Sequence, residues 1–464
     1  MKDGFIRVAA ATPDIHVADP QYNSEQIIEL MEQGSARGVK VMAFPELCLT
    51  AYTCSDLFLQ ESLLREAKKE LKRILQASKS KDMILFVGMP WMHKGKLYNV
   101  AAVLNRGRIL GIVPKKHLPN YSEFYELRHF NPGMEKVEMT DWEGVQVPMG
   151  MNLLFACRTM PELVLAAELC EDVWVPCPPS ISHALAGATV IANCSASDET
   201  TGKDQYRYNL ICGQSARLVC GYIYANAGEG ESSQDLVFGG QNIIAENGTC
   251  LVQSDRFKNA CICADLDLGR IISERRRMTT FRDEENRSAS YETVYFELNT
   301  EDSAKKDSKK AGQKRDELLR YIDPAPFVPH DAGQRERRCE EILSIQAMGL
   351  KKRLAHTNCK HAVIGLSGGL DSTLALLVTV RAFDMLQIPR ENIHCITMPC
   401  FGTTDRTYTN ACTMAKKTGA SLTEINIRDA VTGHFKDINH DIEKHDVTYE
   451  NGQARERTQI LMDI

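Results

Sequence analysis

The feature that most constrains the fold is an apolar run at residues 163–167, which reads Leu-Val-Leu-Ala-Ala. Its length and its polar flanks predict a buried strand. Cys170 follows directly, with Glu168 before it and Glu171 and Asp172 after it. A cysteine at the tip of a core strand is held rigidly and can be reached by a substrate, as a covalent nucleophile must be. Because the chain has 16 cysteines, an inert buried thiol is the alternative at this position.

Strand-like and helix-like segments alternate along the first part of the chain. Strands are expected at residues 5–11, 39–44, 83–88, 99–104, 108–113, 163–168, 189–194, 221–225, 238–245, 249–253 and 261–266. Helices are expected at about 24–38, 60–79 and 205–220. Hairpin turns are expected at 105–107 and 247–248. This pattern predicts an α/β sandwich of about 270 residues, placed at 1–275.

The composition changes after residue 275. Residues 301–317 are dominated by Lys, Asp, Ser and Gln, which is typical of a solvated linker, so we expect a polar linker at 276–325. From 326 to 464, three predicted strands (361–366, 392–398, 421–427) alternate with predicted helices (335–354, 373–386, 405–418, 428–434, 452–464). Such a βα repeat predicts a parallel sheet. A complete domain rarely ends with a three-stranded parallel sheet whose edge strand is uncovered. We therefore expect 326–464 to be only the N-terminal portion of a domain.

The composition excludes several classes of protein. A hydrophobic content of 43% and a charged content of 25% are those of a soluble globular protein. The net charge of −6 gives no basic footprint for nucleic acid. No apolar stretch is long enough for a membrane helix, and the first residues do not resemble a signal peptide. The scattered cysteines include no Cys-x-x-Cys pair, so we expect neither a zinc site nor disulfides, and a cytoplasmic location.

Three predicted strand ends carry reactive groups, namely Glu46, Lys115 and Cys170. A thiol with a pKa of ~8.5 needs a base and a nearby cation to react as a thiolate at neutral pH. Glu46 can take the proton, and Lys115 can stabilise both the thiolate and the oxyanion formed on attack at an amide. Taken singly, Glu46 and Lys115 could also be cap or surface residues.

A second candidate site follows the predicted strand 361–366, where Ser-Gly-Gly-Leu-Asp-Ser at 367–372 leads into a helix. Glycines let the backbone approach a ligand, and the free N–H groups of such a loop bind anions. The loop is not a Walker A motif, because it lacks Gly-Lys-Ser/Thr. Helix capping by Asp371 or Ser372 is the alternative, but it does not account for two consecutive glycines.

The first site resembles a known family. FPELCLTAY at 44–52, VPKKHLPNY with EFYE at 113–126, and AELCEDVWVP at 167–176 resemble the Glu–Lys–Cys motifs of the nitrilase superfamily. More narrowly, they resemble the glutaminase domain of the glutamine-dependent NAD⁺ synthetases. The resemblance implies an αββα sandwich in which Cys170 attacks glutamine, Glu46 is the base and Lys115 stabilises the oxyanion. It also implies that Glu126 orients the lysine and that glutamine is bound by Tyr121, Ser197 and Lys203.

The second site resembles the pyrophosphate-binding loop of the ATP-pyrophosphatase, or adenine nucleotide α-hydrolase-like, family. The resemblance implies an ATP site made by Gly365, Leu366, Ser367, Gly368, Gly369, Leu370, Asp371 and Ser372. It further implies that Asp371 helps to place Mg²⁺. Two more segments, at 398–411 and 445–457, resemble NAD synthetase segments, the first with Cys400 where glycine is usual. Within the second segment, Asn451 is expected to contact deamido-NAD⁺, with Glu450 as a further candidate.

Together the resemblances imply a ligase that forms NAD⁺ from deamido-NAD⁺, ATP and glutamine, with AMP, pyrophosphate and glutamate as products. They imply small-molecule partners, a homo-oligomer when the chain is complete, and a sheltered path for ammonia between the two sites. One alternative is an amidotransferase for another adenylated acid. A second alternative follows from the expected extension past residue 464. Without that extension, the chain would keep only glutaminase activity or a subunit-interaction role.

Overall fold

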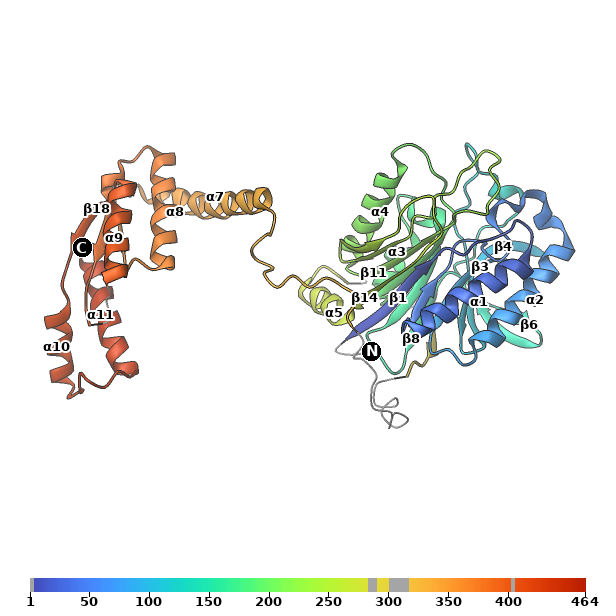
Figure 1. Ribbon diagram of the computed structural model, residues 1–464, viewed down its shortest axis with the longest axis horizontal. Helices are drawn as coiled ribbons and strands as arrows, with labels where there is room; N and C mark the ends of the chain where they lie inside the picture. The colour runs from blue at the N-terminus through green and yellow to red at the C-terminus, as the bar shows by residue number, and fades with distance from the viewer. Residues whose placement is uncertain (1–3, 283–289, 300–316, 402–404) are drawn as a thin grey trace. The chain divides into compact units, whose positions relative to one another are not determined.

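The structure is a computed structural model that describes residues 4–282, 290–299, 317–401 and 405–464. The chain forms two compact units, Met1–Ile322 and Asp323–Ile464 (Figure 1). The boundary between the units falls inside the segment 276–325 that the sequence predicted as a linker. Among the helices of the described ranges, none combines the length and the apolar character needed to cross a membrane.

The first unit contains two sheets. The eight-stranded sheet has the order β14-β1-β2-β3-β4-β5-β7-β6. Its strands are β1 Phe5–Ala11, β2 Val41–Ala43, β3 Ile84–His93, β4 Lys96–Asn105, β5 Arg108–Pro114, β6 Glu138–Trp142, β7 Val145–Met149 and β14 Cys261–Asp267. The seven-stranded sheet has the order β13-β12-β11-β10-β9-β8-β15. Its strands are β8 Leu153–Cys157, β9 Val164–Leu169, β10 Val190–Ser195, β11 Gly221–Asn226, β12 Ile243–Glu246, β13 Thr249–Gln253 and β15 Glu292–Phe296.

The two sheets pack face to face between layers of helices. One apolar cluster joins them, and within it Phe86 of β3 meets Phe155 of β8 edge to face with ring centroids 6.3 Å apart. Helices α1 Pro20–Ala36 and α2 Glu61–Ser78 cover the outer face of the first sheet. Helices α3 Pro179–Leu185 and α4 Lys203–Leu218 cover the second sheet (Figure 1). Central strands buried on both faces read as continuous apolar runs. The predicted αββα sandwich is confirmed.

Parts of the expected linker are folded into the first unit. Strand β15 pairs in parallel with β8 through five residues. The side chain of Arg320 reaches Glu246 through both terminal nitrogens, at 2.8 and 3.0 Å. Helix α5 Leu268–Arg277 also runs past the expected end of the sandwich. The sequence did not predict β15, because this strand lies at the edge of its sheet and one of its faces stays open to solvent. Residues 283–289 and 300–316 of the expected linker lie outside the described residues.

The second unit is built around three parallel strands in the order β16-β17-β18, as predicted. In chain order its elements are α7 Ala332–Thr357, β16 Ala362–Gly365, α8 Leu370–Leu386, β17 Ile393–Thr397, α9 Asp405–Thr418, β18 Ser421–Glu424, α10 Arg428–Asp437 and α11 Val447–Asp463. Three helices, α7, α8 and α11, begin three to five residues earlier than expected. Helix α8 starts directly after the extended Gly369, and α11 is capped by the Asp446 carboxylate, which accepts from the Thr448 and Tyr449 N–H groups.

Candidate active sites

The candidate nucleophile lies at a sharp turn at the end of a central strand. Strand β9 lies between β8 and β10 and ends at Leu169, and the short 3₁₀ turn η3 Cys170–Val173 follows. Cys170 has a left-handed backbone, with φ of 38°, and its side chain is buried. A residue with a Cβ in this region is strained by about 1–3 kcal/mol, which the surrounding structure must offset.

Lys115 follows β5 and lies between two carboxylates. Its Nζ is 2.6 Å from Glu46 Oε1 and 2.6 Å from Glu126 Oε1, and all three residues are buried. Burial acts to lower the pKa of Lys115, but the charges of Glu126 and Glu46 outweigh it and raise that pKa well above its usual value. Lys115 is therefore a permanent cation inside the site. The structure thus brings Glu126 to the lysine, as the sequence anticipated.

Three further groups fix the carboxylates. Asn99 Nδ2 donates to Glu46 Oε1 at 2.6 Å, and the Ala196 N–H donates to Glu46 Oε2 at 3.2 Å. The Tyr52 hydroxyl donates to Glu126 Oε1 at 2.8 Å. Sequence reasoning did not single out any of the three. A signal existed for Asn99, which is a polar residue at the first position of an otherwise apolar predicted strand.

The pKa of the Cys170 thiol is shifted by both the carboxylates and the lysine of this cluster. Burial raises the pKa of the thiol, the Glu46 charge raises it further, and Lys115 only partly offsets them. The resting cysteine is therefore a neutral thiol, not the thiolate that a nearby lysine alone would produce. Consequently its proton has to leave during the attack on substrate. Ser195 lies against Cys170 and donates its own hydroxyl to the Tyr224 oxygen at 2.7 Å.

The three predicted glutamine contacts lie in one neighbourhood. The Tyr121 hydroxyl donates to Glu171 Oε1 at 2.9 Å, and the Tyr121 ring meets Phe124 edge to face. Lys203 Nζ lies 6.0 Å from the centre of the Phe124 ring and 5.5 Å from that of Trp174. The same Lys203 is paired with Asp198, next to the buried Ser197.

Ser197 is engaged by a buried cation. Arg207 of α4 is fully buried, and its Nη2 donates to Ser197 Oγ at 3.3 Å and to the Asp198 carbonyl at 2.9 Å. Its Nη1 donates to Glu199 Oε1 at 2.7 Å. Arg207 therefore holds the loop that carries Ser197. Neither Arg207 nor the rings of Phe124 and Trp174 were predicted, since their partners are set by tertiary packing.

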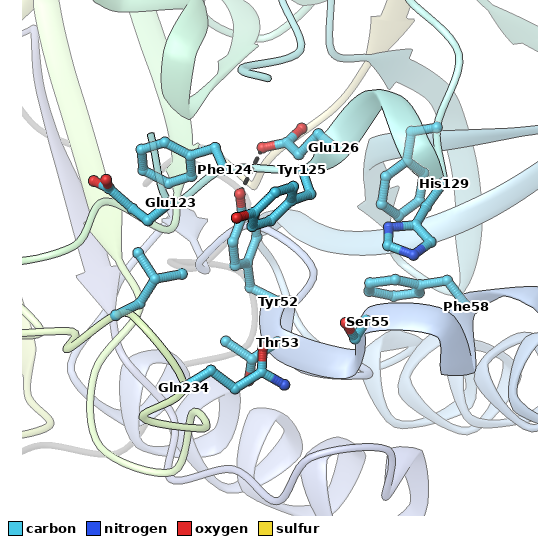
Figure 2. Close-up of a pocket in the computed structure, with 12 residues that line it drawn as sticks. Tyr52, Thr53, Ser55, Phe58, Glu123, Phe124, Tyr125, Glu126, His129 and Gln234 are labelled. Atoms are coloured by element: carbon cyan, nitrogen blue, oxygen red, sulfur yellow. Dashed lines mark hydrogen bonds between the residues drawn. The ribbon is translucent and has the colours of Figure 1, made fainter. Parts of the chain in front are cut away.

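A small cavity of about 60 Å³ opens beside Glu126 and Tyr52. Figure 2 shows these two side chains joined by their hydrogen bond, with Phe124 and Tyr125 close by. The remaining lining residues are Thr53, Ser55, Phe58, Glu123, His129, Phe130, Gln234 and Leu236. The cavity therefore lies on the Glu126 side of the cluster.

The second candidate site is a larger cavity of about 510 Å³ in the Asp323–Ile464 unit. Of the eight predicted ATP contacts, Gly365, Leu366, Ser367 and Gly369 line it. Gly368 shapes the loop, because it has φ of 78° and a Cβ there would lie 2.0 Å from the Thr407 carbonyl oxygen. Leu370 and Asp371 are exposed in the first turn of α8, and Ser372 Oγ lies 3.1 Å from Ser367 Oγ.

The rest of that cavity comes from β17, α9 and α11, and sequence reasoning did not assign most of it. The added residues are Ile396, Thr397, Met398, Thr407, Glu450, Gln453, Arg457 and Leu461. Glu450, Gln453 and Arg457 are spaced three and four residues apart, so they share one face of α11. Asn451 is rotated off that face and is exposed, so the structure does not bring it to the cavity. Residues 402–404 of the expected 398–411 motif lie outside the described residues.

Within the ranges that the structure describes, no three His, Cys, Asp or Glu residues group into a metal site. Mg²⁺ in nucleotide sites is usually held by one or two carboxylates together with phosphates and water. The exposed Asp371 beside the glycine loop and Glu450 in the cavity lining fit that donor set.

Two protein families match the chain, one over each part. The carbon–nitrogen hydrolase family model matches residues 7–276, and the NAD synthase family model matches residues 342–464. The fold and the two sites therefore define a carbon–nitrogen hydrolase unit followed by an NAD synthase unit. The chain is 40% identical to the glutamine-dependent NAD(+) synthetase of Mycobacterium leprae, over 99% of this chain and 68% of that protein. The chain belongs to the glutamine-dependent NAD⁺ synthetase family.

More distant relatives agree. The glutamine-dependent NAD(+) synthetase of Aquifex aeolicus is 28% identical over 98% of this chain and 72% of its own length. The crystal structure of a glutamine-dependent NAD(+) synthetase from Cytophaga hutchinsonii has 23% sequence identity and a TM-score of 0.51. That likeness covers 99% of this chain and 72% of the other, and it supports the fold.

Proposed function

We propose that the chain uses ammonia from glutamine to convert deamido-NAD⁺ to NAD⁺, with ATP as the activating substrate. The observation that carries this proposal is the buried Lys115, held between Glu46 and Glu126 at 2.6 Å from each, at the Cys170 thiol. A buried cation with two carboxylates is costly to maintain, so its presence beside a cysteine favours acyl-transfer chemistry.

In the first reaction, Cys170 Sγ bonds to the side-chain amide carbon of glutamine. Glu46 takes the thiol proton as the bond forms, because the resting thiol is neutral. Lys115 and a backbone N–H stabilise the oxyanion. Collapse of the tetrahedral intermediate breaks the C–N bond, and Glu46 returns the proton to the leaving nitrogen, which departs as ammonia. Water then hydrolyses the thioester, giving glutamate and the free thiol.

The charged groups beside this site suit a free amino acid. Glutamine carries an α-ammonium and an α-carboxylate, and the neighbourhood of Tyr121, Ser197 and Lys203 presents both signs of charge. Lys203 supplies the cation, and Glu171 and Asp198 supply carboxylates within reach of it. We therefore assign glutamine binding to Tyr121, Ser197 and Lys203.

The second unit binds ATP and deamido-NAD⁺ in this proposal. The loop at 365–372 offers N–H groups at the start of α8 to phosphate, and Arg457 adds a positive charge to the cavity. Asp371 would hold Mg²⁺, which compensates phosphate charge when it is bound. ATP adenylates the nicotinate carboxylate with loss of pyrophosphate, and ammonia displaces AMP to give NAD⁺. Asn451 remains our candidate dinucleotide contact from the sequence, although Glu450 and Gln453 line the cavity instead.

We also propose a homo-oligomer in a reducing cytoplasm. All 16 cysteines are free thiols, which is the state expected in a reducing compartment. Oligomer formation rests on the resemblance alone, and the mass of the particle in solution tests it.

The test separates the two reactions. Glutamate release from glutamine is measured first, and NAD⁺ formation is then measured with glutamine and, separately, with ammonium salt. Cys170→Ala should abolish the glutamine-supported reactions and leave NAD⁺ formation from ammonium unchanged. Glutamate release by that variant would refute the first site. Wild-type chain that releases glutamate but makes no NAD⁺ from ammonium would favour the glutaminase-only alternative.

The alternative of another adenylated acid needs its own measurement. Thermal shift in the presence of deamido-NAD⁺ should exceed the shift with equal concentrations of other carboxylic acids. A larger shift with a different acid would contradict the assigned substrate.

A further inference from the structure

Asp172 joins two segments that carry the reactive groups. Its side chain is buried, with 1% of its surface exposed, although it is a carboxylate. Its Oδ2 accepts the Leu169 N–H at 3.1 Å and the Lys116 N–H at 3.4 Å, and its Oδ1 accepts the His117 N–H at 2.9 Å. Leu169 precedes the nucleophile Cys170, whereas Lys116 and His117 follow Lys115.

These two segments come from different sheets. Lys115 follows β5 of the eight-stranded sheet, and Cys170 follows β9 of the seven-stranded sheet. Backbone hydrogen bonds hold Lys115 to the eight-stranded sheet and to the loop before β6. Its N–H donates to the Asn99 carbonyl at 2.9 Å, and its carbonyl accepts the Gly133 N–H at 2.7 Å. The Asp172 carboxylate therefore bridges the two sheets at the point where the nucleophile and the lysine must meet.

The turn at Cys170 needs such a restraint. Its φ of 38° is strained, and a small relaxation would move Sγ relative to Lys115 Nζ and to Glu46. Burial raises the pKa of Asp172 to about 7, while the His117 and Leu169 N–H groups act to lower it. Burying an ionised carboxylate costs free energy and requires the three N–H donors, so the capping of one turn does not by itself explain Asp172.

We propose that Asp172 is a positioning residue for glutamine hydrolysis, which fixes the Cys170 turn against the Lys115 loop without touching substrate. Asparagine has the same shape, but it loses the charge and turns an N–H₂ group toward one of the N–H donors. The Asp172→Asn variant should therefore let the turn and the loop shift relative to each other. Misplacement by about 1 Å costs on the order of 10²-fold in rate.

The experiment compares the 464-residue wild-type chain, Asp172→Asn and Asp267→Asn in glutamate release. Asp267 is a matched control, since its carboxylate also accepts a backbone N–H, that of Arg270 at 2.9 Å, at the start of α5. We expect Asp172→Asn to lower kcat on the order of 10²-fold, with KM for glutamine changed less than about twofold. We expect Asp267→Asn to leave both constants at wild-type values.

A role limited to stability would lower the melting temperature of Asp172→Asn and leave kcat of the folded fraction unchanged, and this result would overturn the proposal. A raised KM with unchanged kcat would also overturn it, because Asp172 would then act on binding. If Asp172→Asn does not fold, Asp172→Glu keeps the charge and should retain part of the activity. A folded Asp172→Glu variant with a lowered kcat and an unchanged KM would support the proposal, because the longer side chain shifts the bridge, whereas wild-type kcat and KM, or a raised KM alone, would overturn it.

The proposal rests on the glutaminase function proposed above. The two fail differently, because wild-type chain that releases no glutamate refutes that function before any variant is compared.

Discussion

The Nζ of Lys115 lies 2.6 Å from Oε1 of Glu46, and neither side chain has any surface exposed to solvent. The pair is therefore unscreened, and each partner is bound to its position by the other's charge. A second carboxylate, that of Glu126, shares the same ammonium.

Replacement of the base should stop turnover and leave binding intact. In Glu46→Gln the neutral amide cannot take the thiol proton, so we expect kcat for glutamate release to fall by about 10²–10⁴-fold with little change in KM. The measurement is steady-state glutamate release at saturating glutamine. Glu25→Gln, at a half-exposed surface pair with Arg73, is the control and should behave as wild type. Wild-type kcat in Glu46→Gln would rule out the assigned base.

Removal of the lysine should cost stability as well as activity. Lys115→Met leaves two buried carboxylates without their cation, and breaking a buried pair in this way costs about 3–5 kcal/mol. We expect a lower unfolding temperature for the first unit by calorimetry. The double variant Lys115→Met/Glu126→Gln should regain part of that loss but no activity. A Lys115→Met chain as stable as wild type would contradict the charge arrangement described here.

The buried His183 should make stability depend on pH. Its Nε2 donates to the Ala167 carbonyl at 3.1 Å, its Nδ1 accepts from the Tyr291 hydroxyl at 2.7 Å, and burial lowers its pKa from 6.5 to about 4. Between these values the unfolded chain binds the proton and the folded chain does not. The contribution is therefore complete above pH 6.5 and is lost as pH falls toward 4, by about 1.4 kcal/mol per pH unit.

The measurement for His183 is the unfolding free energy between pH 7 and pH 4.5 in wild type and in His183→Asn. The variant should show a shallower loss of stability on acidification. Parallel curves for the two chains would show that His183 does not hold its neutral form through folding.

A methyl group at Gly368 should close the candidate ATP site. The new Cβ would lie 2.0 Å from the Thr407 carbonyl oxygen, on a residue with φ of 78°. We expect Gly368→Ala to weaken ATP binding by at least about tenfold in calorimetry, because the loop must move to relieve the clash. Gly349→Ala in α7 is the control, since its Cβ would meet no atom within 4 Å and alanine favours helices. Undiminished ATP binding by Gly368→Ala would place the nucleotide elsewhere.

Much of the fold could be predicted from local sequence patterns. The strands that end before Glu46, Lys115 and Cys170 are apolar runs, and such runs can be recognised without tertiary information. Strand β15 was missed because an edge strand needs only one buried face, and its pairing with β8 depends on residues about 140 positions away. Helix α11 was placed five residues late because Asp446 acts as its cap.

The candidate site shows the same division. Strand-end residues could be anticipated, whereas the roles of Tyr52 and Asp172 are recognisable only by contacts between distant segments. On α11, the motif gave Asn451 with Glu450 as a further candidate, and helical rotation brings Glu450 and also Gln453 to the cavity lining. Motifs identify which segment is involved, while the face of the helix decides which side chain reaches the ligand.

The sharing of one ammonium by Glu46 and Glu126 also bears on the release of product. Hydrolysis turns the neutral amide of glutamine into a carboxylate, which would be the third negative group around Lys115. Glutamate is therefore repelled from the place where it is formed, whereas glutamine is not. For the proposed reaction we therefore expect weak product inhibition and easy release of glutamate.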